Sequence, residues 1–161
     1  MRALPWLTCL FTIPAMSAAL GAQEPQRRRI LPELRADVVT GDVVSAQTAA
    51  GVHITSGTYV RVALLGGYGR AWKDDQHGAS YRLEVDGRFH LDPLRSTRFG
   101  LYGIGGIVTS HDPFDDWQSR LVLGAGVELP AYARATLAIE AALAGGLRVS
   151  IAARRVPLGR R

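Results

Sequence analysis

The sequence predicts an all-β protein whose single domain is an up-and-down antiparallel barrel of eight strands. From residue 33 onward apolar residues recur at alternate positions, which is the periodicity of a strand with two unlike faces. Turn residues interrupt the alternation about every 15 residues, so the segments reach the roughly 9–11 residues that a tilted strand needs to cross a bilayer. The polar faces carry arginine and acid, which is the inside-out pattern of a membrane barrel.

The clearest strand is residues 80–91, in which apolar side chains alternate with charged ones of both signs. The apolar set is Tyr81, Leu83, Val85, Phe89 and Leu91, and the polar set is Arg82, Glu84, Asp86, Arg88 and His90. An ordinary surface strand mixes Ser, Thr, Gln and Lys on its wet side. A row of paired charges therefore favours an inward-facing polar row.

Three strands are predicted before this one. The first, 33–40, sets Leu34, Ala36 and Val38 against Arg35 and Asp37. The second and weaker strand, 44–55, has His53 on its polar side, and Ser56-Gly57 is a tight hairpin turn. The third, 58–72, sets Val60, Val62, Leu64 and Tyr68 against Arg61, Ala63 and Gly67, and residues 74–78 are expected to form a polar loop.

Four strands are predicted after it. Pro93 cannot continue a ladder, so residues 92–97 form a connection. The fifth strand, 98–110, is apolar and rich in glycine, and its facing is ambiguous. A polar loop at 111–116 leads to the sixth strand, 117–129, where Arg120 and Glu128 are polar-facing; the seventh, 133–144, carries Arg134 and Glu140, and the eighth, from 147, carries Arg148, Ser150 and Arg154.

The two ends of the chain differ in composition from the predicted barrel. Residues 1–22 combine a basic start, an apolar run and small residues before Gln23, which predicts a secretory signal peptide that removes Cys9. Residues 23–32 and 157–161 are predicted basic tails around a barrel domain at 33–156. An exported chain without cysteine, and without another long apolar stretch, is periplasmic, secreted or a barrel in an outer membrane.

The net charge of +5 does not indicate a nucleic-acid partner, because of where the charge lies. Between residues 30 and 153 there are 11 Lys and Arg against 13 Asp and Glu. The basic excess lies in Arg27–Arg29 at one end and in Arg154, Arg155, Arg160 and Arg161 at the other, which we expect to be solvated ends.

The polar faces together predict a charge network that fills the barrel interior. Its predicted members are Arg35, Asp37, Arg61, Arg82, Glu84, Asp86, Arg88, His90, Arg120, Glu128, Arg134, Glu140 and Arg148. Arginine suits this role because its planar guanidinium makes two-pronged contacts with carboxylates. Eight strands also give an interior that side chains just fill, so the lumen is predicted to be plugged.

No catalytic site or cofactor site is predicted. Ser110-His111-Asp112 has the residue types of a hydrolase triad, but neighbouring strand residues point in opposite directions. Asp112, Asp115 and Asp116 are weak candidates for a divalent-cation site, with a solvated acidic loop as the simpler interpretation. The repeated glycines open no helix, so they do not indicate a phosphate-binding loop.

The whole pattern resembles the small eight-stranded outer-membrane β-barrel proteins of the OmpA and OmpX type. The run Arg88–Leu94 followed by Gly100-Leu101-Tyr102-Gly103 resembles uncharacterised outer-membrane barrels in particular. The resemblance implies a monomer in the outer membrane of a Gram-negative-type bacterium, with termini in the periplasm. It also implies membrane lipid and the outer-membrane assembly machinery as partners, and a non-enzymatic structural or envelope role. Such barrels normally end on an aromatic residue, whereas this chain ends Val156–Arg161.

Two other hypotheses remain open at this point. A soluble periplasmic barrel that binds a small apolar ligand, as lipocalins do, would need its charged rows to face water. An outer-membrane enzyme similar to the barrel-type lipid A deacylases would need a Ser–His pair on an outward-facing strand end, and the sequence offers no clear one.

Overall fold

The computed structural model describes residues 29–91, 99–130 and 135–155. The predicted signal peptide at 1–22 and the predicted tail at 157–161 lie outside the described residues. So does Arg134, one predicted member of the charge network, and so do Arg27 and Arg28. No helix among the described residues is long and apolar enough to cross a membrane.

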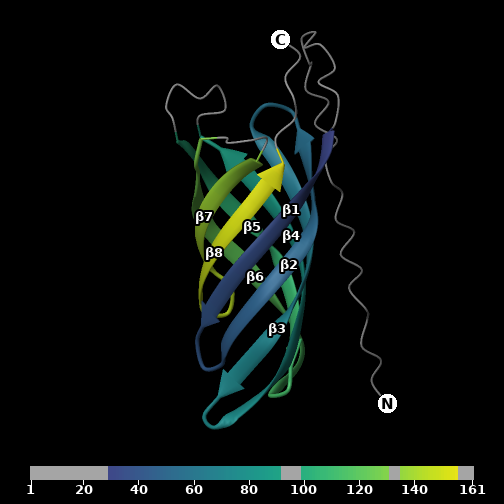
Figure 1. Cartoon of the computed structure of the whole chain (residues 1–161), viewed down its shortest axis with the longest axis vertical. Coiled ribbons are helices and arrows are strands. Elements are labelled where there is room, and N and C mark those ends of the chain that lie inside the picture. The colour runs from purple at the N-terminus through teal and green to yellow at the C-terminus, as the bar shows by residue number, and fades with distance from the viewer. Residues whose placement is uncertain (1–28, 92–98, 131–134, 156–161) are drawn as a thin grey trace, which may run out of the picture.

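The described residues form eight strands that close into one antiparallel barrel (Figure 1). The strands are β1 (Arg29–Thr40), β2 (Val44–Ser56), β3 (Val60–Lys73), β4 (Gln76–His90), β5 (Gly100–Asp112), β6 (Asp115–Glu128), β7 (Ala135–Leu143) and β8 (Leu147–Arg155). Each strand pairs with the next along the chain, and β1 closes the barrel against β8 from Glu33↔Arg154 to Thr40↔Leu147. The predicted fold class is confirmed.

The connections β1–β2, β3–β4, β5–β6 and β7–β8 all lie at one end of the barrel (Figure 1). The first residue of β1 and the last residue of β8 lie at the other end. We call the end with these four connections the hairpin end, and the other the terminal end. The turns at the hairpin end are short, and two of them contain a left-handed residue, Asp74 with φ 52° and Gly145 with φ 78°. Gly57 at the terminal end has φ 76° and is the first residue of the β2–β3 turn. This turn contains three residues, 57–59, because Ser56 still pairs with Val60, so the turn is longer than predicted at Ser56-Gly57 and begins one residue later.

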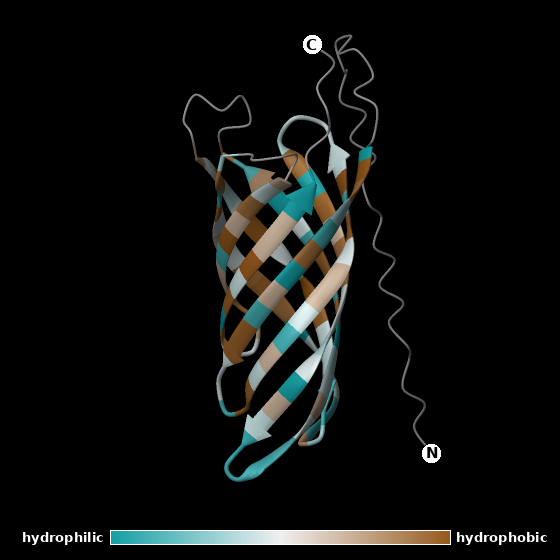
Figure 2. Cartoon of the chain, viewed as in Figure 1, coloured by the Kyte–Doolittle hydropathy of each residue, from teal (hydrophilic) through white to brown (hydrophobic). Residues whose placement is uncertain are grey.

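The two faces of the sheet are sorted as the alternation predicts. On β4, Arg82, Glu84 and Arg88 are 4%, 1% and 0% exposed, whereas Leu83, Val85 and Phe89 are 58%, 50% and 53% exposed. The same alternation of apolar and polar residues appears in Figure 2 as changes between brown and teal or white along each strand. The barrel thus buries its charges and exposes its large apolar side chains.

Part of the interior is apolar. Residues of β5 to β8 and the turn before β8 form a buried cluster of Tyr102, Ile104, Val108, Val122, Ala138, Ala142, Ala144 and Ala152. This cluster resolves the facing of β5, whose apolar residues lie on both faces: Tyr102, Ile104 and Val108 point inward, and Leu101 and Ile107 point outward.

Several strands are longer than predicted, and two expected loops are mostly strand. β1 begins at Arg29, four residues before Glu33, so Arg29 belongs to the wall and not to a tail. β4 begins at Gln76 and β6 at Asp115, which reduces the expected polar loops at 74–78 and 111–116 to turns. The strand ladder β3–β4 continues as far as Lys73↔Gln76, because polar residues can extend a wall into water.

Candidate functional site

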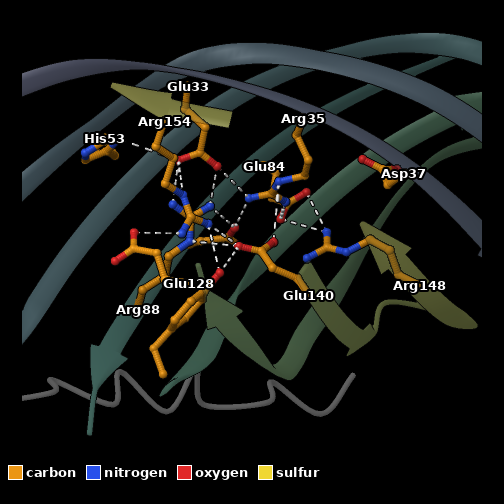
Figure 3. Close-up of polar contacts among 12 residues, drawn as sticks. Glu33, Arg35, Asp37, His53, Glu84, Arg88, Glu128, Glu140, Arg148 and Arg154 are labelled. Atoms are coloured by element: carbon orange, nitrogen blue, oxygen red, sulfur yellow. Dashed lines mark hydrogen bonds and ion pairs between the residues drawn. The ribbon is translucent and has the colours of Figure 1, made fainter. Parts of the chain in front are cut away.

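The most distinctive feature of the molecule is a group of ion-paired side chains inside the barrel, which we call the interior charge cluster (Figure 3). Its members are Glu33, Arg35, Asp37, Arg61, Arg82, Glu84, Asp86, Arg88, Glu128, Glu140, Arg148 and Arg154. Each stands at an inward position of β1, β3, β4, β6, β7 or β8, and all but Arg61 are buried. The period of two places alternate residues of one strand on the same face, so one strand can turn several charged side chains toward the interior.

Glu33 on β1 is one hub of the cluster. Its carboxylate accepts two hydrogen bonds of 2.6 Å from the guanidinium of Arg88, in the two-pronged geometry of a strong pair. Nε of Arg154 donates to the same carboxylate at 3.1 Å, and Nη2 of Arg35 lies 3.4 Å from it. Glu33 therefore ties the first strand to the fourth and to the last.

Glu84 on β4 is the second hub. It accepts a hydrogen bond of 2.7 Å from Nη1 of Arg35, and Nη1 of Arg148 lies 2.7 Å from both its oxygens. Arg35 contacts both Glu84 and Glu33, so this arginine bridges the two hubs. It also donates to Asp86 at 2.9 Å. Nearer the hairpin end, Arg82 makes a two-pronged contact with Asp37, with distances of 2.7 and 2.6 Å.

A tyrosine connects the charge cluster to the apolar cluster. The hydroxyl of Tyr102 on β5 donates to Glu140 at 2.7 Å and accepts a hydrogen bond of 3.0 Å from Arg154. Arg154 also pairs with Glu140 directly. Nearer the terminal end, Glu128 accepts a hydrogen bond of 2.8 Å from Arg61, whose side chain is 24% exposed.

The cluster is electrically balanced. Among the described residues its members are six acids and six arginines. Burying an ion costs several kcal/mol unless a well-placed partner compensates it, and the two-pronged contacts supply that compensation. The arrangement can hold strands together and fill space, and it contains no nucleophile beside a base.

The structure brings most of the predicted network together. Ten predicted members are buried inside the barrel: Arg35, Asp37, Arg82, Glu84, Asp86, Arg88, His90, Glu128, Glu140 and Arg148. Arg61 is half-buried at the terminal end. Arg120 lies apart, at the hairpin end, where it donates to Gln118 and lies 4.0 Å from Asp115.

Four residues that belong to the charge cluster or contact it were not among the predicted members. Glu33, His53 and Arg154 are buried polar residues, and Tyr102 belongs to the apolar cluster. The expectation that Arg154 is a solvated end is wrong, because it is 2% exposed and opposite Glu33 in the β1–β8 ladder. Arg154 stands an even number of residues from Arg148 and Ser150 on the same strand, and this spacing is the sequence feature that places it on the inward face. Glu33 was likewise in phase with Arg35 and Asp37.

One of the metal candidates, Asp112, has another role. Oδ1 of Asp112 accepts hydrogen bonds from the backbone N–H groups of Phe114 and Asp115, at 2.9 and 3.0 Å, and so shapes the β5–β6 turn. The described residues contain no group of three or more His, Cys, Asp or Glu side chains arranged to hold a metal ion.

A small polar pocket of about 110 Å³ opens near the hairpin end. Its lining includes Gln47, Ser80, Arg82, Arg120 and Asp115. Gln47 donates to Ser80 at 2.5 Å. The hubs Glu33 and Glu84 are not part of this lining, so the pocket reaches the cluster at Arg82 and does not extend to the hubs.

Comparison with known proteins gives the fold and no more specific relationship. No protein-family model matches the chain, and no curated protein matches it. Among solved structures, Neisserial surface protein A is similar over 78% of this chain and 94% of that chain, with a TM-score of 0.55 and 10% sequence identity. A de novo designed transmembrane β-barrel is similar over 78% of this chain and 93% of the design, with a TM-score of 0.52 and 15% identity.

Proposed function

We propose that the chain is a non-enzymatic barrel of a bacterial outer membrane, with its apolar wall against lipid and its interior closed by the charge cluster. The observation that carries this proposal is the sorting of the two faces on β4, with buried arginines and exposed aliphatic and aromatic side chains. In water such a wall would be a large exposed apolar surface, which soluble monomers rarely have. Both solved structures named above share the fold, and one is described as a transmembrane barrel.

Rows of aromatic residues support a membrane position. Near the terminal end, the rings of Tyr59 and Phe89 stack at 5.9 Å. Near the hairpin end, neighbouring rings in the series Tyr68, Tyr81, His111 and Trp117 lie 5.4, 6.4 and 5.5 Å apart. Aromatic rings at the two ends of an apolar band are typical of transmembrane barrels.

The spacing of these rows fits a bilayer. Tyr81 and Phe89 stand eight residues apart on β4. With about 3.3 Å per residue and a strand tilt of about 40°, the two levels are separated by about 20 Å. The apolar band of outer-membrane barrels is about 25 Å tall, so the rows would lie near its two borders.

A closed interior and short turns favour a structural role in the envelope. Six arginines and six acids pair across the space that a channel would need. If the termini face the periplasm, the short turns at the hairpin end face outward and leave little surface for capturing a ligand. The partners would then be membrane lipid and the assembly machinery.

The two alternative hypotheses fit the geometry less well. A lipocalin-like soluble barrel needs an apolar interior and a polar exterior, which is the reverse of the facing on β4. For a lipid-modifying enzyme, the available histidine is His111, whose ring stacks between Tyr81 and Trp117. The hydroxyl of Ser119, two residues after Trp117 on β6, hydrogen bonds to Thr109 at 2.9 Å. These two side chains therefore do not form the Ser–His pair that such an enzyme needs.

Membrane fractionation of the expressed protein tests the proposal. We expect the protein to stay with the membranes after a carbonate wash, to need detergent for extraction, and to migrate differently on gels before and after heating. Recovery in osmotic-shock fluid would contradict membrane insertion. In planar bilayers we expect no stepwise conductance, and reproducible steps would contradict the closed interior while leaving insertion intact.

A further inference from the structure

The outer wall carries an apolar groove over β8, β1, β2 and β3, on the face toward the viewer in Figure 1, and it continues to Tyr81 and Leu83 on β4 and Trp117 on β6. It consists of two adjoining hollows of about 650 and 560 Å³ that share Thr48 and Tyr68. Ligand pockets typically have volumes of about 300–1,000 Å³, so the first hollow alone could accommodate part of a lipid chain.

The groove follows from the sizes of neighbouring residues. In one cross-strand row, Ala46 on β2 stands between Val38 on β1 and Arg70 on β3. In the next row, Ala36 on β1 stands beside Ile151 on β8. Small side chains form the floor and larger ones form the walls, which are mostly apolar. Arg70 stands just beyond the lining, at the end of the row through Val38 and Ala46.

Arg70 is an exposed cation at the edge of the groove. Its cross-strand neighbours are Ala46 and Ala79, which leave its side chain unobstructed. Within the described part of the chain it makes no hydrogen bond or ion pair, and no acid occupies an outward position on β8, β1, β2 or β3. Its charge is therefore available to an external anion.

The height of Arg70 on the wall places it near the lipid headgroups. It lies two residues beyond Tyr68 toward the hairpin end, which at the same rise and tilt is about 5 Å above the aromatic row. Trp72 is the next outward residue on the strand. Aromatic rings favour the membrane border, so the guanidinium would reach the layer that contains phosphate groups.

We propose that this groove binds one anionic, phosphate-bearing membrane lipid, with an acyl chain in the apolar hollows and the phosphate at Arg70. The inference rests on the proposed membrane insertion. A second copy of the chain is a poorer occupant, because the same face would bring no acid to Arg70. A lipid meets both halves of the site, since it joins an anion to an apolar chain.

Quenching of tryptophan fluorescence by brominated lipids tests the proposal. Trp117 lines the second hollow and Trp72 neighbours Arg70, so both report on nearby chains. The protein is inserted into vesicles that contain a small fraction of phosphatidylglycerol or of phosphatidylcholine, each with the same brominated chains. One basic residue near a membrane surface corresponds to about a fivefold preference for anionic lipid, and we expect a preference of that size.

Two pairs of variants separate the site from general charge and shape. Arg70→Gln should abolish the preference, whereas Arg155→Gln, which removes an exposed charge near the terminal end of β8, should retain it. Ala46→Leu should fill the first hollow and reduce quenching, whereas Ala141→Leu on the exposed face of β7 should not. Equal quenching by both lipids, or a preference that survives Arg70→Gln, would overturn the lipid site alone. A protein that fails to insert at all would overturn the proposed function together with this inference.

Discussion

Removing one carboxylate from the interior charge cluster is expected to destabilise the barrel strongly. The substitution Glu33→Gln keeps the size of the side chain and deletes its charge. Glu33 is 1% exposed and receives two contacts of 2.6 Å from Arg88, one of 3.1 Å from Arg154 and one of 3.4 Å from Arg35. The balance of six acids and six arginines would then become five and six.

The expected magnitude follows from the burial of these partners. The side chains of Arg35 and Arg88 are 0% exposed and that of Arg154 is 2% exposed, so water cannot replace the lost carboxylate. Breaking a buried pair by removing one partner costs about 3–5 kcal/mol. We expect Glu33→Gln to lower the free energy of unfolding by an amount in that range.

Equilibrium unfolding by urea in lipid vesicles, followed by circular dichroism, measures this change. The matched control is Asp115→Asn, because Asp115 lies 4.0 Å from Arg120 and its side chain is 42% exposed. Exposed pairs contribute about 0–1 kcal/mol, so the control should remain close to the unmodified protein. If both variants lose the same small amount, the interior is hydrated enough to screen its charges, and the argument for a closed interior fails.

Three further substitutions probe other parts of the wall and core, each by the same unfolding measurement. Val85→Arg puts a cation at an outward position that is 50% exposed and lies midway between the two aromatic rows on β4, where it should cost about 2–4 kcal/mol at the bilayer midplane; an unchanged stability would indicate that water surrounds it. Gly126→Ala places a Cβ 2.3 Å from Cζ of Tyr102 and should cost about 1–3 kcal/mol through overpacking, whereas Gly105→Ala, with nothing within 4 Å, should be tolerated; equal effects would show that the ring moves freely. Tyr102→Phe deletes a hydroxyl that joins two charged groups and should cost about 1.5–3 kcal/mol; a neutral result would mean that those groups pair equally well without it.

The sequence predicts the strands and their facing wherever the two faces differ in polarity. On β4 every charged residue alternates with an apolar one, so the phase is unambiguous. Over residues 100–108 of β5 both faces are apolar or glycine, because Tyr102, Ile104 and Val108 belong to the apolar cluster of the interior. A pattern of polarity cannot orient a strand that is apolar on both faces.

Strand ends and the pairing of charges were harder to predict. Gln76 and His77 are polar residues that continue the β3–β4 ladder, and polarity alone does not distinguish such a segment from a loop. The alternation places Glu33 and Arg88 on inward faces, but their contact depends on the stagger of strands that are 55 residues apart. Pairing across the interior is a property of the closed barrel and is not encoded in local spacing.

The seam between β1 and β8 gives the charge cluster a consequence for assembly. Glu33 stands beside one side of that seam and Arg154 beside the other, so the compensation of charge is complete only when the last strand has docked on the first. A slip of one residue at the seam would turn either row of charges toward the hydrocarbon. The same contacts would therefore destabilise a barrel closed in any other register. They would favour the one closure in which β8 pairs with β1 as observed.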